Sequence, residues 1–286
     1  MNFYKYLLLT TLYATFFASC SALKDLTSIQ KPDLSVNDVR ISDASLSDLE
    51  LTFDIEVDNP NSIAINLTSY NYDFLISDRS FVSGDQSLST EILSTNKSIV
   101  QIPVRFTYEE LFKTFSDIRD QDETEYELNS VIGVNLPVLG FTEIPLKKSG
   151  VIPVIKPPKV SVSRLSVKNL SFTKADLELI LNIDNPNAFG ISLRETDYTI
   201  SINGLESISG KSLNPIEIKE KNSGTISVPV SLNFIQLGRS AYNLIKEDQP
   251  LEYILSGSTD VESTLPFFKT SSYNFDRSGT VNIFNN

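Results

Sequence analysis

Two stretches of nine residues decide the fold: 53–61, FDIEVDNPN, and 179–187, LILNIDNPN. In the first, apolar and polar residues alternate until Asn-Pro-Asn follows an Asp; the second repeats this, with Ile180 in one polar position. Such alternation is typical of a β-strand with one buried and one wet face. Asn and Asp side chains bond to nearby backbone, and Pro lacks an N–H, so the ladder cannot continue. We therefore expect two equivalent strands to end at the same motif, which consists of Asn59, Pro60, Asn61, Asn185, Pro186 and Asn187.

The sequence around these strands is repeated at a distance of 126 positions, as Asp58 and Asp184 show. Tyr72 and Gly84 recur as Tyr198 and Gly210, and an apolar-Pro-apolar triplet occurs at 102–104 and again at 228–230. A period this long indicates tandem domains, because solenoid repeats are far shorter. The predicted organisation is a first domain over 34–154, a Pro-containing linker at 155–159 and a second domain over 160–286.

Each repeat is expected to be an antiparallel β-sandwich. Alternating patterns predict strands at 34–41, 49–58, 63–67, 70–76 and 100–106, with others near 126–128 and 151. Pro103 suits an edge strand or a bulge. Apolar residues at 108, 111, 112 and 115 predict one helix, with Thr107 as its N-cap. In the second repeat Asn233 is the expected cap, and Phe234, Leu237, Ala241 and Leu244 form the stripe. The predicted fold is thus all-β, with two tandem sandwiches of about seven strands plus one helix each.

Composition excludes several classes of protein. The 286 residues carry 36 acidic and 24 basic side chains, and the net charge of −12 argues against binding to nucleic acid. A single Cys cannot form an intrachain disulfide, and without His a zinc site built from Cys and His is excluded. No cofactor is expected.

The amino terminus is typical of an export signal. Lys5 precedes an apolar run at 7–17, which is too short to span a bilayer, and Ala18-Ser19-Cys20 follows. This arrangement resembles the lipobox of bacterial lipoproteins, although Phe17 stands where Leu is usual. The resemblance implies a signal peptide over 1–19 and a membrane anchor through an acylated Cys20. It also implies a tether over 20–33 and, because Ser21 follows the Cys, an address at the outer membrane.

Both repeats resemble the WHy domain, the water-stress and hypersensitive-response domain of type 2 late-embryogenesis-abundant proteins. The resemblance rests on the strand ending in Asn-Pro-Asn, the Tyr-containing strand, the apolar-Pro-apolar triplet and the single helix. It implies a sandwich of the fibronectin type III kind and a role in desiccation and stress tolerance, including protection of other proteins. The family has no catalytic residues, so the Asn-Pro-Asn residues carry over only as a structural motif.

Other functional readings find less support in the residues. An enzyme would need a nucleophile with a base, a metal or a carboxylate pair, and the usual neutral-pH base, His, is missing. The acidic group Asp117, Asp120, Asp122, Glu123 and Glu125 has the oxygen ligands that Ca²⁺ prefers but lacks EF-hand spacing, so we expect a solvated loop. Asn66 fits a glycosylation acceptor, a weak reading for a bacterial lipoprotein. The remaining surface feature is the acidic outer face of the first long strand, Glu50, Asp54, Glu56 and Asp58, together with Ile180 on the corresponding face of the second.

The sequence therefore predicts a lipid-anchored, non-catalytic envelope protein that protects or binds other proteins under desiccation or stress. Its partners are expected to be the membrane, through Cys20, and envelope or client proteins. The alternative is a structural or adhesive module for one specific envelope protein or glycan. A protector should suppress aggregation of unrelated proteins, whereas a specific binder should retain one partner.

Overall fold

The computed structural model describes residues 29–204, 208–237, 239–246 and 250–285. They form two compact units. The first contains the described residues up to Ser42, Glu50–Phe106 and Glu123–Ile152; the second contains Asp43–Leu49, Thr107–Asp122 and the chain from Pro153 onward. The expected signal peptide, Cys20 and most of the tether lie outside the described residues.

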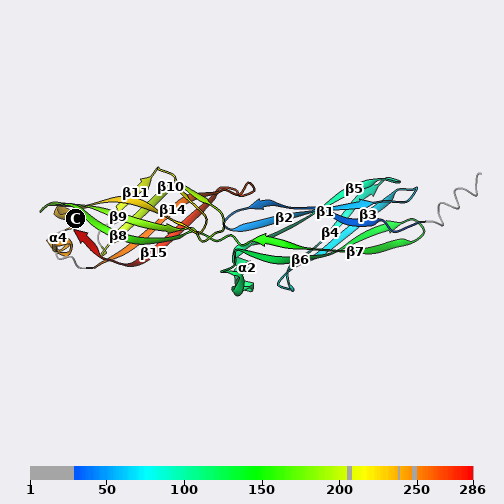
Figure 1. Cartoon of the computed structure of the whole chain (residues 1–286), viewed down its shortest axis with the longest axis horizontal. Coiled ribbons are helices and arrows are strands. Elements are labelled where there is room, and N and C mark those ends of the chain that lie inside the picture. Colours follow the sequence, from blue (N-terminus) through cyan, green and yellow to red (C-terminus); the bar gives the residue numbers. More distant parts are fainter. Residues whose placement is uncertain (1–28, 205–207, 238, 247–249, 286) are drawn as a thin grey trace, which may run out of the picture. The chain divides into compact units, whose positions relative to one another are not determined.

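The first unit is built from two sheets (Figure 1). One has the strand order β1-β2-β5, with β1 (Asp33–Ala44), β2 (Asp48–Asp58) and β5 (Lys97–Thr107). The other has the order β4-β3-β6-β7, with β4 (Arg79–Ile92), β3 (Ile65–Ile76), β6 (Glu123–Leu136) and β7 (Gly140–Pro153). Pro103 lies in β5 at the edge of its sheet, as expected for a residue that cannot donate to the ladder.

Aromatic rings join the two sheets of this unit. Phe53 on β2 lies 5.8 Å from the ring of Tyr126 on β6 and 6.5 Å from that of Phe74 on β3, measured between centroids. Phe53 and Phe74 are fully buried. Because each such side chain contributes about 1.5–3 kcal/mol when it leaves water, the alternating face of β2 is the main reason that the sheets pack. The all-β sandwich predicted from the alternation is confirmed.

One strand is longer than the sequence suggests. Residues 63–67 and 70–76 were expected as two strands, but β3 is continuous from Ile65 to Ile76. The register shifts between Leu67 and Ser69, and the Thr68 hydroxyl donates to the carbonyl of Gly133 at 3.2 Å. Because the bulge adds one residue to the strand, the buried apolar residues have odd numbers before it and even numbers after it. The sequence therefore shows two separate alternating patterns within one continuous strand.

The helix of the first repeat begins where the sequence predicts. In α2 (Tyr108–Thr114), Thr107 is the N-cap: its hydroxyl accepts from the N–H of Glu110 at 3.2 Å. The Glu110 carboxylate accepts from the N–H of Thr107 at 3.4 Å, which completes a capping box. A short helix, η1 (Ser116–Ile118), follows, and both helices belong to the second unit.

The second unit has the same two-sheet plan. Its sheets have the orders β13-β9-β8-β16 and β11-β10-β14-β15, with β12 also paired to β10. The described strands are β8 (Lys159–Leu170), β9 (Lys174–Asp184), β10 (Ile191–Ile202), β11 (Ile208–Ser212), β12 (Ile216–Ile218), β13 (Ser223–Asn233), β14 (Leu251–Ser263), β15 (Ser271–Val281) and β16 (Ile283–Asn285). The described part of this unit thus exceeds the expected seven strands, because three-residue strands such as β12 are too short to show alternation.

Helical residues follow β13 as expected. The Asn233 side chain accepts from the N–H of Ile235 at 3.0 Å, which gives α3 (Phe234–Leu237) the predicted cap. A second segment, α4 (Arg239–Lys246), follows it. Phe234 is buried. The side chains of Leu237, Ala241 and Leu244 lie outside the described part of the chain.

Tyrosine rings explain why two glycines recur in the repeats. Tyr72 faces Gly84 across the β3–β4 pair, and a Cβ on that glycine would lie 2.8 Å from the Tyr72 ring. Tyr198 faces Gly210 in the same way across the β10–β11 pair, and its ring occupies the place of the missing side chain. Each tyrosine thus lies flat over a glycine of the neighbouring strand.

Candidate functional site

The first Asn of each motif binds the carbonyls of a neighbouring loop. The Asn59 amide nitrogen donates to the carbonyls of Ile63 (2.9 Å), Ile92 (3.3 Å) and Leu93 (3.0 Å). Asn185 does the same with residues 126 positions later, the carbonyls of Phe189 (2.7 Å), Ile218 (3.4 Å) and Lys219 (3.0 Å). Both asparagines are buried. They therefore satisfy backbone acceptors that water cannot reach.

The second Asn holds the segment that enters each sandwich. Asn61 accepts from the N–H of Gln30 at 2.8 Å and donates to the carbonyl of Gln30 at 2.9 Å. Asn187 forms the same pair of bonds with Lys156, both at 2.8 Å. A side-chain amide bound to one residue's N–H and C=O replaces a rung of a β-ladder. We call these contacts the Asn61 clamp and the Asn187 clamp.

The two Asn side chains of a motif also bind each other. The Asn59 oxygen accepts from the N–H of Asn61 at 3.1 Å and from its side-chain amide at 2.9 Å. The corresponding distances from Asn185 to Asn187 are 3.1 and 3.0 Å. Among the described residues no buried side-chain polar atom lacks a hydrogen-bond partner. The amides are fully engaged with the protein, so this arrangement supports the fold and leaves no group for chemistry.

Cations neutralise the acidic face of β2. Lys97 lies 2.6 Å from Glu56 and 3.3 Å from Asp58, and these carboxylates raise the pKa of the Lys97 amine, with Glu56 the larger cause. Arg40 pairs with Asp54. Such exposed pairs contribute little stability, because solvent and salt screen them. The face is a ladder of ion pairs rather than a free acidic surface.

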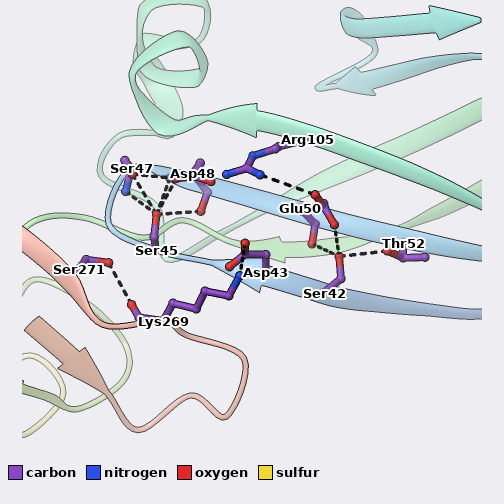
Figure 2. Close-up of polar contacts among 10 residues, drawn as sticks. All are labelled: Ser42, Asp43, Ser45, Ser47, Asp48, Glu50, Thr52, Arg105, Lys269 and Ser271. Carbon is purple, nitrogen blue, oxygen red and sulfur yellow. Dashed lines mark hydrogen bonds and ion pairs between the residues drawn. The ribbon is translucent and has the colours of Figure 1, made fainter.

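Glu50, the fourth acid of this face, completes a small polar network in the first unit (Figure 2). It accepts from the Ser42 hydroxyl at 2.8 Å and lies 3.9 Å from the Arg105 guanidinium. Thr52 donates to Ser42 at 3.0 Å. The corresponding face of β9 carries a half-buried Ile180.

The turn Asp43–Leu49 contributes polar contacts within the second unit (Figure 2). Lys269 donates from its amine to Asp43 at 2.6 Å and from its backbone to the carbonyl of Ala44 at 2.8 Å. The N–H of Leu46 donates to the Ser271 hydroxyl at 3.1 Å. The Leu46 side chain packs against the apolar core of this unit. The loop between β14 and β15 is therefore covered.

A cationic cavity of about 580 Å³ lies in the second unit. Its walls include the aromatic rings of Phe112 and Tyr273 and five cations: Arg119, Lys156, Lys159, Lys221 and Arg277. The excess of positive charge would suit an anionic group, in contrast to the negative charge of the whole chain.

Protein groups already bind most of these cations. Lys221 and Lys156 both pair with Asp122, and Lys221 also donates to the carbonyl of Pro186 at 2.8 Å. Arg277 donates to the carbonyl of Val160 at 2.9 Å and to the Tyr273 hydroxyl at 3.2 Å. These cations therefore stabilise the contacts between segments of this unit through bonds to protein groups.

In the acidic segment 117–125, Asp122 has a structural role, because it pairs with Lys156 and Lys221. The lysines beside Asp122, Lys221 first, lower the pKa of its carboxyl group below the usual range. Among the described residues, no group of three or more acidic or Cys side chains is placed to hold a metal ion. Within the same residues, no helix has the length and apolarity needed to cross a bilayer.

Sequence reasoning missed both clamps and the cavity. Asn61 binds the backbone of Gln30, and Asn187 binds the backbone of Lys156. Because the residue held by the clamp is Gln in one repeat and Lys in the other, its side chain does not reveal the clamp in the sequence. The repeat distance of 126 positions, which also separates Gln30 from Lys156, is the one feature that could have indicated them.

A known protein family matches both repeats. A family described as "Late embryogenesis abundant protein" matches residues 54–150 and 181–279, together more than half of the chain. Over 127 residues the chain is 28% identical to late embryogenesis abundant protein Lea14-A of Gossypium hirsutum. It is 29% identical over 127 residues to the probable desiccation-related protein LEA14 of Arabidopsis thaliana. Each match covers 44% of this chain and 84% of the relative.

Among solved structures, a solution structure of an Arabidopsis thaliana protein is 28% identical, with a TM-score of 0.38. The match covers 44% of this chain and 83% of that one. The family match in both repeats carries the assignment. The chain belongs to the late embryogenesis abundant protein family, type 2, whose members named here support a desiccation- or stress-related role.

Proposed function

We propose that this chain is a non-catalytic, lipid-anchored protein of the cell envelope that protects or binds other proteins during desiccation or related stress. The observation that carries the protective role is the family match in both repeats, whose relatives bear desiccation-related names. The observation that supports the anchor is the single Cys at position 20, directly after a short apolar run and Ala18-Ser19. The proposed address is the outer membrane, because Ser21 follows the Cys.

The contacts of the polar side chains support a non-catalytic role. The chain has no His, and the asparagines of both motifs are bound to backbone and to each other. The acids of β2 are paired with cations. A catalytic group needs a free, positioned atom with a perturbed pKa near the working pH, and these residues supply none.

Edge strands are the surface on which client proteins would bind. In the first unit β4 and β7 are the outer strands of their sheet. An edge strand presents backbone donors and acceptors that can pair with an extended segment of another chain. Such contacts depend little on the client's sequence, as a general protector requires.

Mass spectrometry of the membrane-extracted mature protein tests the anchor, with a Cys20→Ala chain as the control. The expected mass is that of a chain beginning at an acylated residue 20, and the control should lack the lipid and stay unprocessed. A mature chain with an intact or unmodified amino terminus would remove the anchor and the envelope address from the proposal.

An aggregation assay tests the protective role separately. Drying or heating unrelated enzymes with the purified chain should preserve their solubility, and an equal mass of an unrelated acidic protein serves as the control. Retention of one envelope protein or glycan in a pull-down, without protection of unrelated enzymes, would favour a specific adhesive module instead.

A further inference from the structure

The turn between β6 and β7, together with the start of β7, exposes three large apolar side chains. Val138 is 75% exposed, Leu139 54% and Phe141 60%. The stretch 136–142, LPVLGFT, contains no charged residue. Leu93, 57% exposed, lies in the β4–β5 loop of the same unit. A single exposed apolar residue is ordinary, but several at one end of a unit mark a binding surface. We call these four residues the apolar tip.

The backbone of the tip is strained at Val138. Val138 has a φ of +69°, a conformation that β-branched residues rarely adopt and that Asn or Gly would accept readily. The next glycine, Gly140, has a φ of +73°. A valine in this position costs stability and gains no burial in return, which is the pattern expected where a residue serves function.

The tip lies at the end of the first unit where the described chain begins. Ile65 pairs with Ile92, and Asn66 pairs with Asn135, so the β4–β5 loop and the β6–β7 turn share one end of the sheet (Figure 1). The carbonyl of Leu93 binds Asn59, and the neighbouring Asn61 holds Gln30. The described chain therefore begins beside the tip.

The equivalent turn of the second unit is covered. Between β14 and β15 the sequence again reads Leu-Pro followed by two apolar residues, Phe267 and Phe268. Both are only half-exposed, and Phe268 forms an isolated bridge with Ala44. In the second unit the apolar turn thus has a protein segment against it. The described residues of the first unit provide no such cover for Val138 and Leu139.

We propose that the apolar tip inserts into the surface of the lipid bilayer. This inference rests on the proposed anchor: Cys20 is only nine residues before Ile29, a stretch that can reach at most about 30 Å, so an acylated Cys20 would hold the tip close to lipid. Four apolar side chains are too few for a stable protein interface, whereas they suffice to enter the interfacial layer. The negative charge of the chain also disfavours pairing of two identical tips.

A tryptophan at the tip tests the proposal, because the chain has no Trp of its own. Leu139 is the site of choice, since its φ is not positive and a large side chain fits the exposed position. Full-length Leu139→Trp chain, with and without Cys20→Ala, is mixed with phosphatidylcholine vesicles. The expected result is a blue shift of Trp emission and loss of most of that emission when the lipids carry bromine on their acyl chains.

Leu213→Trp is the matched control, since Leu213 is also exposed, at 67%, but belongs to the second unit. Its emission should not change with vesicles. Emission from position 139 that stays that of water-exposed Trp would overturn the proposal, as would a blue shift that grows with protein concentration without lipid, which would identify a second copy as the occupant.

The two proposals fail separately. An acylated Cys20 together with a water-exposed Trp at 139 would refute the tip and keep the anchor. Lipid contact at position 139 in a chain whose Cys20 is never acylated would keep the tip and refute the anchor.

Val138→Asn separates binding from folding. Asn accepts a positive φ, so the variant should unfold at a higher temperature than the unchanged chain. The substitution also removes an apolar side chain that would be partly buried in the bilayer, so the affinity for vesicles should fall about fivefold. Unchanged vesicle affinity in this more stable variant would contradict the proposal.

Discussion

Asn59 and Asn185 show at the scale of single residues what a sequence motif can and cannot predict. The Asp-Asn-Pro-Asn pattern correctly predicts where β2 and β9 end, at Asp58 and Asp184. It does not reveal that each first Asn binds three backbone carbonyls, because those acceptors lie 4 to 34 positions further along the chain. Backbone partners have no residue identity, so no local pattern can identify them.

Asn59→Ala should lower the free energy of unfolding by about 2–4 kcal/mol, because it removes the side-chain donor to three carbonyls and the side-chain acceptor of the Asn61 backbone N–H. Asn185→Ala should do the same in the second unit. Urea titration followed by circular dichroism measures the effect. Asn66→Ala, at an exposed position, is the control and should change stability by less than about 0.5 kcal/mol.

Asp122 should make the second unit sensitive to acid. Its folded-state pKa is lowered below the ordinary 3.8, chiefly by Lys221. Its contribution is therefore complete above pH 3.8 and is lost as the pH falls through the lower, folded-state pKa. Because the side chain is 42% exposed, solvent screening limits this contribution to under about 1 kcal/mol.

Thermal unfolding of Asp122→Asn beside the unchanged chain measures this effect. The variant should be the less stable of the two at pH 7, and the difference should shrink below pH 3.8. A difference that stays constant down to the acid limit would show that the carboxylate charge is not the cause.

At the scale of elements, glycines in the strands of the second unit differ in what surrounds them. The atoms nearest to a Cβ on Gly210 would be those at the far end of the Tyr198 side chain. A Cβ on Gly257, in β14, would meet the backbone carbonyl of Asp197 and the ring of Phe275. A ring can rotate at modest cost, whereas a paired strand cannot retreat without losing its ladder.

Gly257→Ala should therefore destabilise by about 3 kcal/mol and Gly210→Ala by about 1 kcal/mol. Denaturant midpoints of the two variants provide the comparison. Equal losses of stability in the two variants would contradict the prediction, because they would show that the paired strands β10 and β14 move apart as easily as the Tyr198 ring rotates.

Elements with an uninterrupted period were predictable, and the others were not. The strands at 49–58 and 100–106 and the Thr107-capped helix follow directly from their patterns. The bulge at Thr68 broke β3 into two expected strands, and β12 is too short to carry a pattern. The exposed turn at Val138 could not be recognised, because exposure depends on which strands surround it.

At the scale of the whole molecule, the repeat was the most informative signal. One motif recurring in register predicted both sandwiches, whereas the hydrogen bonds of Asn59, Asn185 and the two clamps became visible only in the structure. The cationic cavity was not predictable, because its walls come from segments far apart in a chain whose overall charge has the opposite sign.

That overall charge predicts how the protein should associate with lipid. The net charge of −12 argues against electrostatic attraction to anionic headgroups, so vesicle association of a chain without the proposed acyl anchor should depend on the apolar tip. Raising the salt concentration should leave binding to phosphatidylcholine unchanged for a chain that begins at Ser21, which lacks both the acyl anchor and the apolar run, and adding anionic lipid should not strengthen it. Vesicle sedimentation measures both, and binding that weakens steeply with salt would contradict this prediction.

The Asn61 clamp also determines how the first unit would respond to mechanical tension. Both backbone groups of Gln30 are held by one buried amide, so a pull from the amino-terminal side meets this clamp before it reaches β1. Since β7 begins at the tip end and finishes at Pro153, the chain leaves the unit at the opposite end. Tension between these two points runs along the strands, so the β1–β2 hydrogen bonds bear the force together in shear instead of opening one by one. If the proposed anchor at Cys20 holds, the first unit is thus arranged to resist extraction from the membrane.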